Sequence, residues 1–209
     1  MKQNKTTIVS TIICLLPILL ALAVYDKLPE LVAIHFNFAG EADSYAPKAM
    51  AVFGLPLMMA VINLITNIAL DHDPKKANAS KVLALVGRWT IPVMTFVLMG
   101  ITIFKSLGAE IAINKVIPFF VGILFFAIGN YLPKCRQNYT VGIKTPWTLS
   151  SEENWNRTHH VSGYLWMVMG AILAVSGFFS FNSAIFIGII LSLAVVPIGY
   201  SFWLYKKGI

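Results

Sequence analysis

The chain has 209 residues and a formal net charge of +7, and its composition is 57% hydrophobic and only 12% charged. Long apolar runs and their connections take up nearly the whole length, so no independent soluble domain of ordinary size fits. A β-barrel is disfavoured as well, because its strands would alternate apolar and polar residues, whereas these runs are apolar on every face.

Six apolar stretches are long enough to cross a hydrocarbon core of roughly 30 Å as a helix, which takes about 20 residues. The sequence therefore predicts an all-α integral membrane protein, a single bundle of six transmembrane helices. The first stretch is expected to be retained as a signal anchor, because it has no small-residue cleavage site. The six stretches cover residues 7–25, 49–70, 85–104, 115–132, 161–180 and 183–204.

The basic residues predict that both termini lie inside. With this orientation, twelve of the 16 lysines and arginines, Arg88 among them, fall on the inner side and four on the outer side, as the positive-inside rule requires. The positive charge is thus a topology signal, and no direct nucleic-acid partner is expected. The two cysteines, Cys14 and Cys135, fall in different environments, so no disulfide, zinc site or other cofactor is expected.

The predicted outer loop, residues 26–48, has a short polar motif in its middle. His35-Phe-Asn37 is followed by Gly40 and Asp43, which predicts an extended piece and then a turn. These four residues are candidates for binding a peptide or an ion at the outer surface. The alternative is that they hydrogen-bond one another and cap the second span, because backbone polar groups near lipid must be satisfied.

The predicted inner loop, residues 133–160, is a polar island between apolar runs. Ser150, followed three residues later by Glu153, is typical of a capping box and predicts a helix start near Ser151. The result is a platform of aromatic, basic and histidine side chains. The candidate functional or partner-binding residues on it are Asn138, Thr140, Gly142, Lys144, Pro146, Trp147, Glu152, Trp155 and His159.

Both loops resemble one known family. The inner letters run Gly129-Asn-Tyr-Leu-Pro-Lys, Asn138-Tyr-Thr-Val-Gly-Ile-Lys-Thr-Pro-Trp-Thr-Leu, then Glu152, Trp155, Thr158-His159 and Gly163. The outer letters are Leu28-Pro, Ile34-His-Phe-Asn, Gly40, Asp43 and Lys48. Together they are similar to the SdpI-type family, the immunity proteins against sporulation-delaying toxin, with its small N-terminal DUF1648-like module.

The resemblance implies a multipass protein of the bacterial plasma membrane, not an enzyme, that protects against a secreted, membrane-active peptide toxin. It further implies signalling by holding a cytoplasmic transcriptional repressor at the membrane. The expected partners are the lipid bilayer, the toxin and this repressor. The expected division is residues 1–70 as a two-span module with the toxin-facing loop, and residues 71–209 as a four-span region with the signature loop.

Two alternatives stay open from the residues alone. A small transporter or channel is disfavoured because the six stretches show no ionisable residue at mid-depth, and Asn63 and Asn67 are interpreted as contacts between helices. A metal-binding membrane enzyme could use Asp71-His72-Asp73 and His159-His160, but their spacing matches no known metal helix, and solvated loop ends are the alternative. No catalytic residue and no metal ligand is predicted.

Several glycines are interpreted as points where two helices approach closely. They are Gly87, Gly100, Gly122, Gly129, Gly163, Gly170, Gly177 and Gly188.

Overall fold

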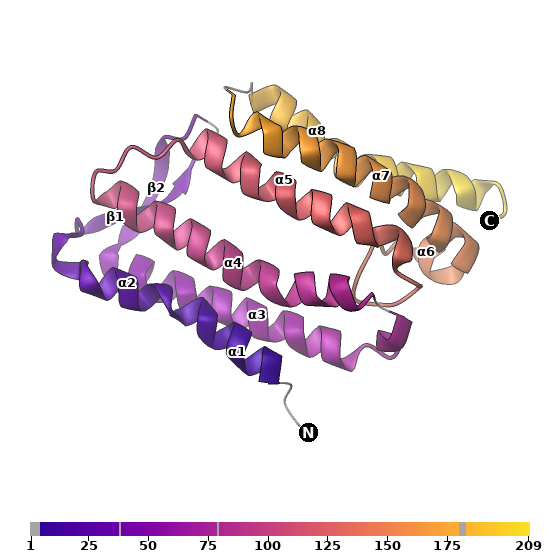
Figure 1. Cartoon of the computed structure of the whole chain (residues 1–209), viewed down its shortest axis with the longest axis horizontal. Helices are drawn as coiled ribbons and strands as arrows, with labels where there is room; N and C mark the ends of the chain where they lie inside the picture. The colour runs from indigo at the N-terminus through magenta and orange to yellow at the C-terminus, as the bar shows by residue number, and fades with distance from the viewer. Residues whose placement is uncertain (1–4, 38, 79, 180–182) are drawn as a thin grey trace. The chain divides into compact units, whose positions relative to one another are not determined.

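Over the residues that it describes, the computed structural model is mostly helical and has one two-stranded sheet (Figure 1). It describes residues 5–37, 39–78, 80–179 and 183–209. The α-helices are α1 Lys5–Leu15, α2 Pro17–Ala23, α3 Leu55–His72, α4 Lys81–Ser106, α5 Ile113–Tyr131, α6 Pro146–Ser150, α7 Glu152–Ser176 and α8 Ser183–Lys206. The strands are β1 Leu31–Phe36 and β2 Ala42–Pro47, and the short helical turns are η1 Tyr25–Lys27, η2 Met50–Gly54, η3 Lys76–Asn78 and η4 Leu132–Lys134.

Five helical segments of the described chain are long and apolar enough to cross a membrane. They are Lys5–Ala23, Met50–His72, Lys81–Ser106, Ile113–Lys134 and Ser183–Lys206. The predicted span 161–180 coincides with α7 as far as Ser176, while residue 180 lies outside the described part. We attribute the absence of α7 from the five candidate spans to its polar first turns, Glu152 to His160. The chain is therefore a helical membrane protein, and the count of six spans stays a prediction.

The first of two compact units comprises described residues of 1–68 and 87–113. Its strands pair antiparallel, with Val32 opposite Ala46 and an irregular register around His35. Val32 is buried in a core with residues of α2, η2 and α4. The all-α prediction is thus wrong for this segment. Only a short extended piece was expected because β2 reads Ala-Asp-Ser-Tyr-Ala-Pro, and Asp, Ala and Pro are depleted in strands.

Polar side chains join three helices of the first unit. The Asn63 side-chain amide of α3 lies 3.0 Å from the hydroxyls of both Ser10 and Thr11 on α1. Arg88 Nη1, on α4, donates to Asn67 Oδ1 at 2.7 Å. The interpretation of the two asparagines as contacts between helices is confirmed. The charge count had assigned Arg88 to the inner side, but the structure places it two turns inside α4, bonded to α3.

The second unit comprises described residues of 69–86 and 114–209, and glycines bring two of its helices together. A methyl group on Gly122 of α5 would lie 2.3 Å from the Ala174 nitrogen of α7, closer than real contacts allow. The close-packing prediction is confirmed for Gly122, Gly129, Gly163, Gly170 and Gly177. It is wrong for Gly100 and Gly188, which have open space around them.

Candidate functional site

The hairpin segment, residues 26–48, presents an exposed, hydrogen-bonded pair of side chains. His35 Nδ1 lies 2.6 Å from Asp43 Oδ1, and their side chains are 69% and 43% exposed. The irregular register of β1 and β2 at His35 lets this pair form across the hairpin. These two candidate residues therefore bond each other, and both stay open to a ligand. The side-chain hydrogen bonds of His35, Asn37 and Asp43 stay within the hairpin segment of the described chain, so the predicted capping of the second span is wrong.

The other two candidates of the hairpin segment shape its turn. Asn37 Oδ1 accepts hydrogen bonds from the backbone nitrogens of Ala39 and Glu41, at 2.9 and 3.0 Å. Gly40 is buried and has φ +83°, a conformation that favours glycine. Its carbonyl oxygen accepts from Lys105 Nζ at 2.6 Å. No signal in the sequence indicates Lys105, because it lies on α4, far along the chain from Gly40.

The signature loop, residues 133–160, is organised by two buried acceptors. Asn138, which is fully buried, accepts from the backbone nitrogens of Thr140 and Val141 at 3.0 and 2.7 Å. The carboxylate of Asp73, from the segment after α3, accepts from the backbone nitrogen of Tyr139 at 2.9 Å and from the Thr140 hydroxyl. Asn138 and Thr140 therefore stabilise the conformation of the loop.

Asp73 is the organising residue that the sequence did not identify. Burial raises its pKa, but hydrogen bonds from Thr140, Lys75 and Tyr139 outweigh this effect and hold the pKa below its ordinary value. The carboxylate is therefore ionised at neutral pH. From the sequence alone, Asp73 is interpreted only as a loop end or a metal ligand, because its hydrogen-bond partners in the signature loop lie more than sixty positions away.

A buried histidine locks the middle of the loop to α7. The ring of His159 stacks on Trp155 with centroids 3.9 Å apart, and its Nδ1 donates to the Trp155 carbonyl at 2.7 Å. Its Nε2 accepts from the Ile143 nitrogen at 2.9 Å. Burial lowers the pKa of His159 to about 4, so the ring is neutral. Gly142 has φ +117°, and a methyl group there would lie 2.4 Å from His159 Nε2.

The two helices that leave the loop start with well-formed caps. Thr145 and Thr148 form a capping box around α6, whose first residue is Pro146. Ser151 caps α7 by accepting from the Asn154 nitrogen at 3.2 Å. The predicted helix start near Ser151 is confirmed, but the capping box expected from Ser150 and Glu153 is wrong, because the neighbouring serine provides the cap.

The remaining candidates of the signature loop lie at or near its surface. Trp147 is half-buried and donates through Nε1 to the Ser201 hydroxyl of α8 at 2.6 Å. Lys144 is exposed and donates to the Thr140 carbonyl at 3.0 Å. Glu152 is exposed and lines an open polar cavity. The predicted platform thus divides into a buried scaffold and a smaller surface.

The described residues contain no group of three or more His, Cys, Asp or Glu side chains placed to hold a metal ion. Asp73 already accepts hydrogen bonds from the loop. Both ring nitrogens of His159 are occupied by backbone groups.

The apolar helices and the two polar loops between them are those of a multipass helical membrane protein. Comparison with known proteins adds two matches to family models and one similar protein. Residues 134–201 match the SdpI/YfhL protein family, and residues 12–60 match a domain of unknown function, DUF1648. The chain is 29% identical over 205 residues to the immunity protein SdpI of Bacillus subtilis (strain 168), covering 97% of each chain.

The resemblance to the SdpI-type family is thereby confirmed. The N-terminal match includes the whole hairpin, and the C-terminal match includes every candidate residue of the signature loop. No solved structure matches the chain.

Proposed function

We propose that this protein lies in the plasma membrane of a bacterium and gives it resistance to a membrane-active peptide toxin. The observation that carries this proposal is the similarity to the immunity protein SdpI, which extends over 97% of both chains. Each of the two loops also lies in a segment that matches its family model. The role is one of binding and protection, and no catalytic residue is assigned.

The proposed topology has six spans with both termini inside, α7 supplying the fifth span. The hairpin segment then lies outside and the signature loop inside. The division into a module of residues 1–70 and a region of residues 71–209 is part of this proposal. The placement of basic residues supports the orientation.

Cysteine labelling of intact cells tests the topology. Cys14 and Cys135 are buried, whereas Ser44 and Ser150 are exposed on the hairpin segment and the signature loop. A membrane-impermeant maleimide should label Ser44→Cys in intact cells and label Ser150→Cys only after lysis. Labelling of Ser150→Cys from the medium would reject the proposed orientation.

The two loops are proposed to have different partners. His35 and Asp43, the exposed pair of the hairpin segment, are assigned to contact with the toxin, and Asn37 and Gly40 to shaping the turn that presents it. The exposed part of the signature loop is assigned to a cytoplasmic partner. The resemblance implies that this partner is a transcriptional repressor.

A survival assay tests the protective function. Expression in a bacterium that is sensitive to sporulation-delaying peptide should raise survival above that of cells carrying the empty vector. Unchanged killing at normal membrane levels of the protein would contradict immunity. Passage of ions or solutes by the protein reconstituted in liposomes would instead favour the transporter alternative.

A further inference from the structure

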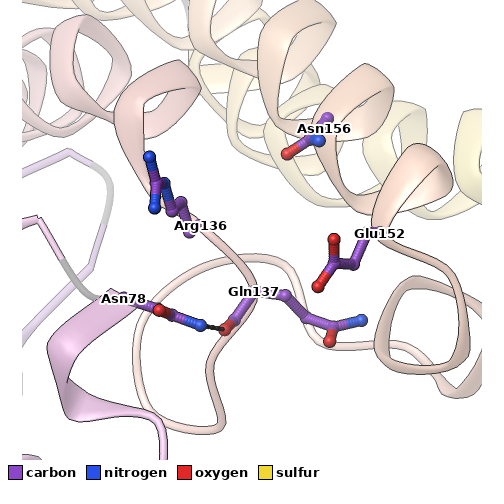
Figure 2. Close-up of a pocket in the computed structure, with 5 residues that line it drawn as sticks. All are labelled: Asn78, Arg136, Gln137, Glu152 and Asn156. Atoms are coloured by element: carbon purple, nitrogen blue, oxygen red, sulfur yellow. Dashed lines mark hydrogen bonds between the residues drawn. The ribbon is translucent and has the colours of Figure 1, made fainter.

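The second unit contains an open polar cavity of about 260 Å³ beside the start of α7. It is lined by Asn78, Arg136, Gln137, Glu152 and Asn156, whose side chains are drawn in Figure 2. The position of Glu152 among these residues makes the cavity part of the signature loop's exposed surface.

One wall of the cavity is held in place by hydrogen bonds. Gln137 Nε2 donates to the carbonyls of Thr148 and Leu149 at 3.0 and 2.8 Å, and its Oε1 accepts from Lys75 Nζ at 2.6 Å. Asn78 Nδ2 donates to the Gln137 carbonyl at 3.0 Å. Because this wall is fixed before any ligand arrives, little ordering is needed on binding.

The other three side chains of the cavity are free. Arg136, Glu152 and Asn156 are exposed, and their side chains make no hydrogen bond or ion pair with another described residue. The neighbouring Glu153 and Arg157, by contrast, form an ion pair at 2.6 Å. The cavity therefore presents one cation, one anion and one amide, all available for binding.

These groups determine the kind of ligand. Small-molecule sites usually enclose about 300–1,000 Å³ and are mostly apolar, whereas this cavity is smaller and lined by polar residues. It suits one or two side chains of a protein. A guanidinium binds a carboxylate with two parallel hydrogen bonds, and a free carboxylate selects a cationic group. Segments 71–81 and 133–160 carry seven lysines and arginines against four acids, which attracts an acidic partner.

We propose that this cavity docks a segment of a cytoplasmic protein that presents an acidic side chain to Arg136 and a basic side chain to Glu152. In the docked segment, one residue lies between the acidic residue and the basic residue, because alternate side chains of an extended segment point the same way. Asn156 hydrogen-bonds the segment between them. This inference rests on the proposed inner position of the signature loop.

The test uses the full-length protein in lipid nanodiscs and a capped probe peptide, acetyl-Ala-Glu-Gly-Lys-Ala-amide, with binding followed by saturation-transfer NMR. The charged probe should bind at least about fivefold more tightly than acetyl-Ala-Gln-Gly-Gln-Ala-amide, which is the effect expected from one ion pair. Arg136→Gln and Glu152→Gln should each weaken binding by about fivefold.

Matched controls come from the neighbouring pair. Glu153→Gln removes a negative charge one position after Glu152, and Arg157→Gln removes a positive charge one position after Asn156. Each of these variants should change binding by less than about twofold. Arg136→Lys should restore part of the affinity. Size-exclusion profiles check that each variant is folded, which is expected because all four substituted side chains are exposed and the bond between Glu153 and Arg157 is a surface pair.

Three results would overturn the proposal: no binding of the charged probe, equal binding of the neutral probe, or equal weakening by the control variants. The survival assay reads out protection separately. Probe binding without protection would reject the proposed function alone, and protection without probe binding would reject this cavity assignment alone.

Discussion

The hairpin segment and the signature loop are both rich in polar residues, but they use them in opposite ways. In the hairpin segment, His35 and Asp43 form a pair on the surface. In the signature loop, Asn138, Trp155 and His159 are completely buried and satisfy backbone groups or one another. A pattern of polar and aromatic residues in a membrane protein can therefore mark a folded scaffold as readily as a binding surface.

The largest effect is expected from Gly142→Ala. The new methyl group would lie 2.4 Å from His159 Nε2, at a residue with φ +117°. Because the clash and the backbone strain act together, we expect a loss of about 3 kcal/mol or more in the free energy of unfolding. The measurement is denaturant unfolding of the purified protein in detergent.

Gly108→Ala is the control for this substitution. Gly108 has φ +92° but nothing within 4 Å of the added methyl group, so only backbone strain remains. Its cost should be about 1 kcal/mol. Equal costs for the two variants would show that the contact between Gly142 and His159 is unimportant, and the contrast between scaffold and surface would weaken.

A pH dependence is the second expected effect. His159 in the folded loop stays neutral down to about pH 4, whereas an exposed histidine binds a proton near pH 6.5. The opened loop thus binds more protons between these values. The free energy of opening should be greatest above pH 6.5 and fall by about 3 kcal/mol as the pH decreases to about 4.

Hydrogen exchange of the Ile143 amide measures this opening, because that amide donates to His159. The His159→Gln variant removes the imidazole and should lose most of the pH dependence. A protection factor of the Ile143 amide, taken relative to the intrinsic exchange rate at each pH, that varies with pH equally in both proteins would show that another group controls the loop.

The third prediction concerns the exposed pair. Replacing both His35 and Asp43 by Gln and Asn should change the free energy of unfolding by less than about 1 kcal/mol, since even a charged pair contributes little when it is exposed. The same denaturant experiment checks it. A loss as large as that of Gly142→Ala would show that the pair is part of a scaffold, and the contrast between the two regions would fail.

The smallest change in the free energy of unfolding is expected from Lys144→Gln, in the signature loop. Lys144 is exposed, and its one hydrogen bond goes to the Thr140 carbonyl. Lys144→Gln should therefore cost less than about 0.5 kcal/mol. A much larger cost would mean that the exposed residues of the loop also hold the fold, and that its surface cannot be separated from its scaffold.

The sequence predicted local features well. Apolar length located the helices, the start of α7 was placed within one residue, and glycines marked the close approach of α5 and α7. These features succeed because neighbouring residues determine them. The hairpin was predicted only in part, because its second strand has few strand-forming residues and depends on pairing with β1.

The long-range bonds of the candidate site and between the helices could not be predicted. Asp73 binds residues more than sixty positions away, Arg88 bonds to Asn67 across two helices, and Lys105 anchors Gly40. Such contacts depend on how distant segments pack, which a single sequence does not state. The burial of His159 is of the same kind, since a helix start near Ser151 was predicted but the loop that covers this histidine was not.

The most direct test of the central claim is the survival of toxin-treated cells that express the His35→Gln, Asp43→Asn double variant at the same membrane level as the unchanged protein. If the hairpin segment meets the toxin, survival should fall towards that of cells with the empty vector while the protein stays folded. Survival equal to that given by the unchanged protein would contradict the claim that this exposed pair contacts the toxin.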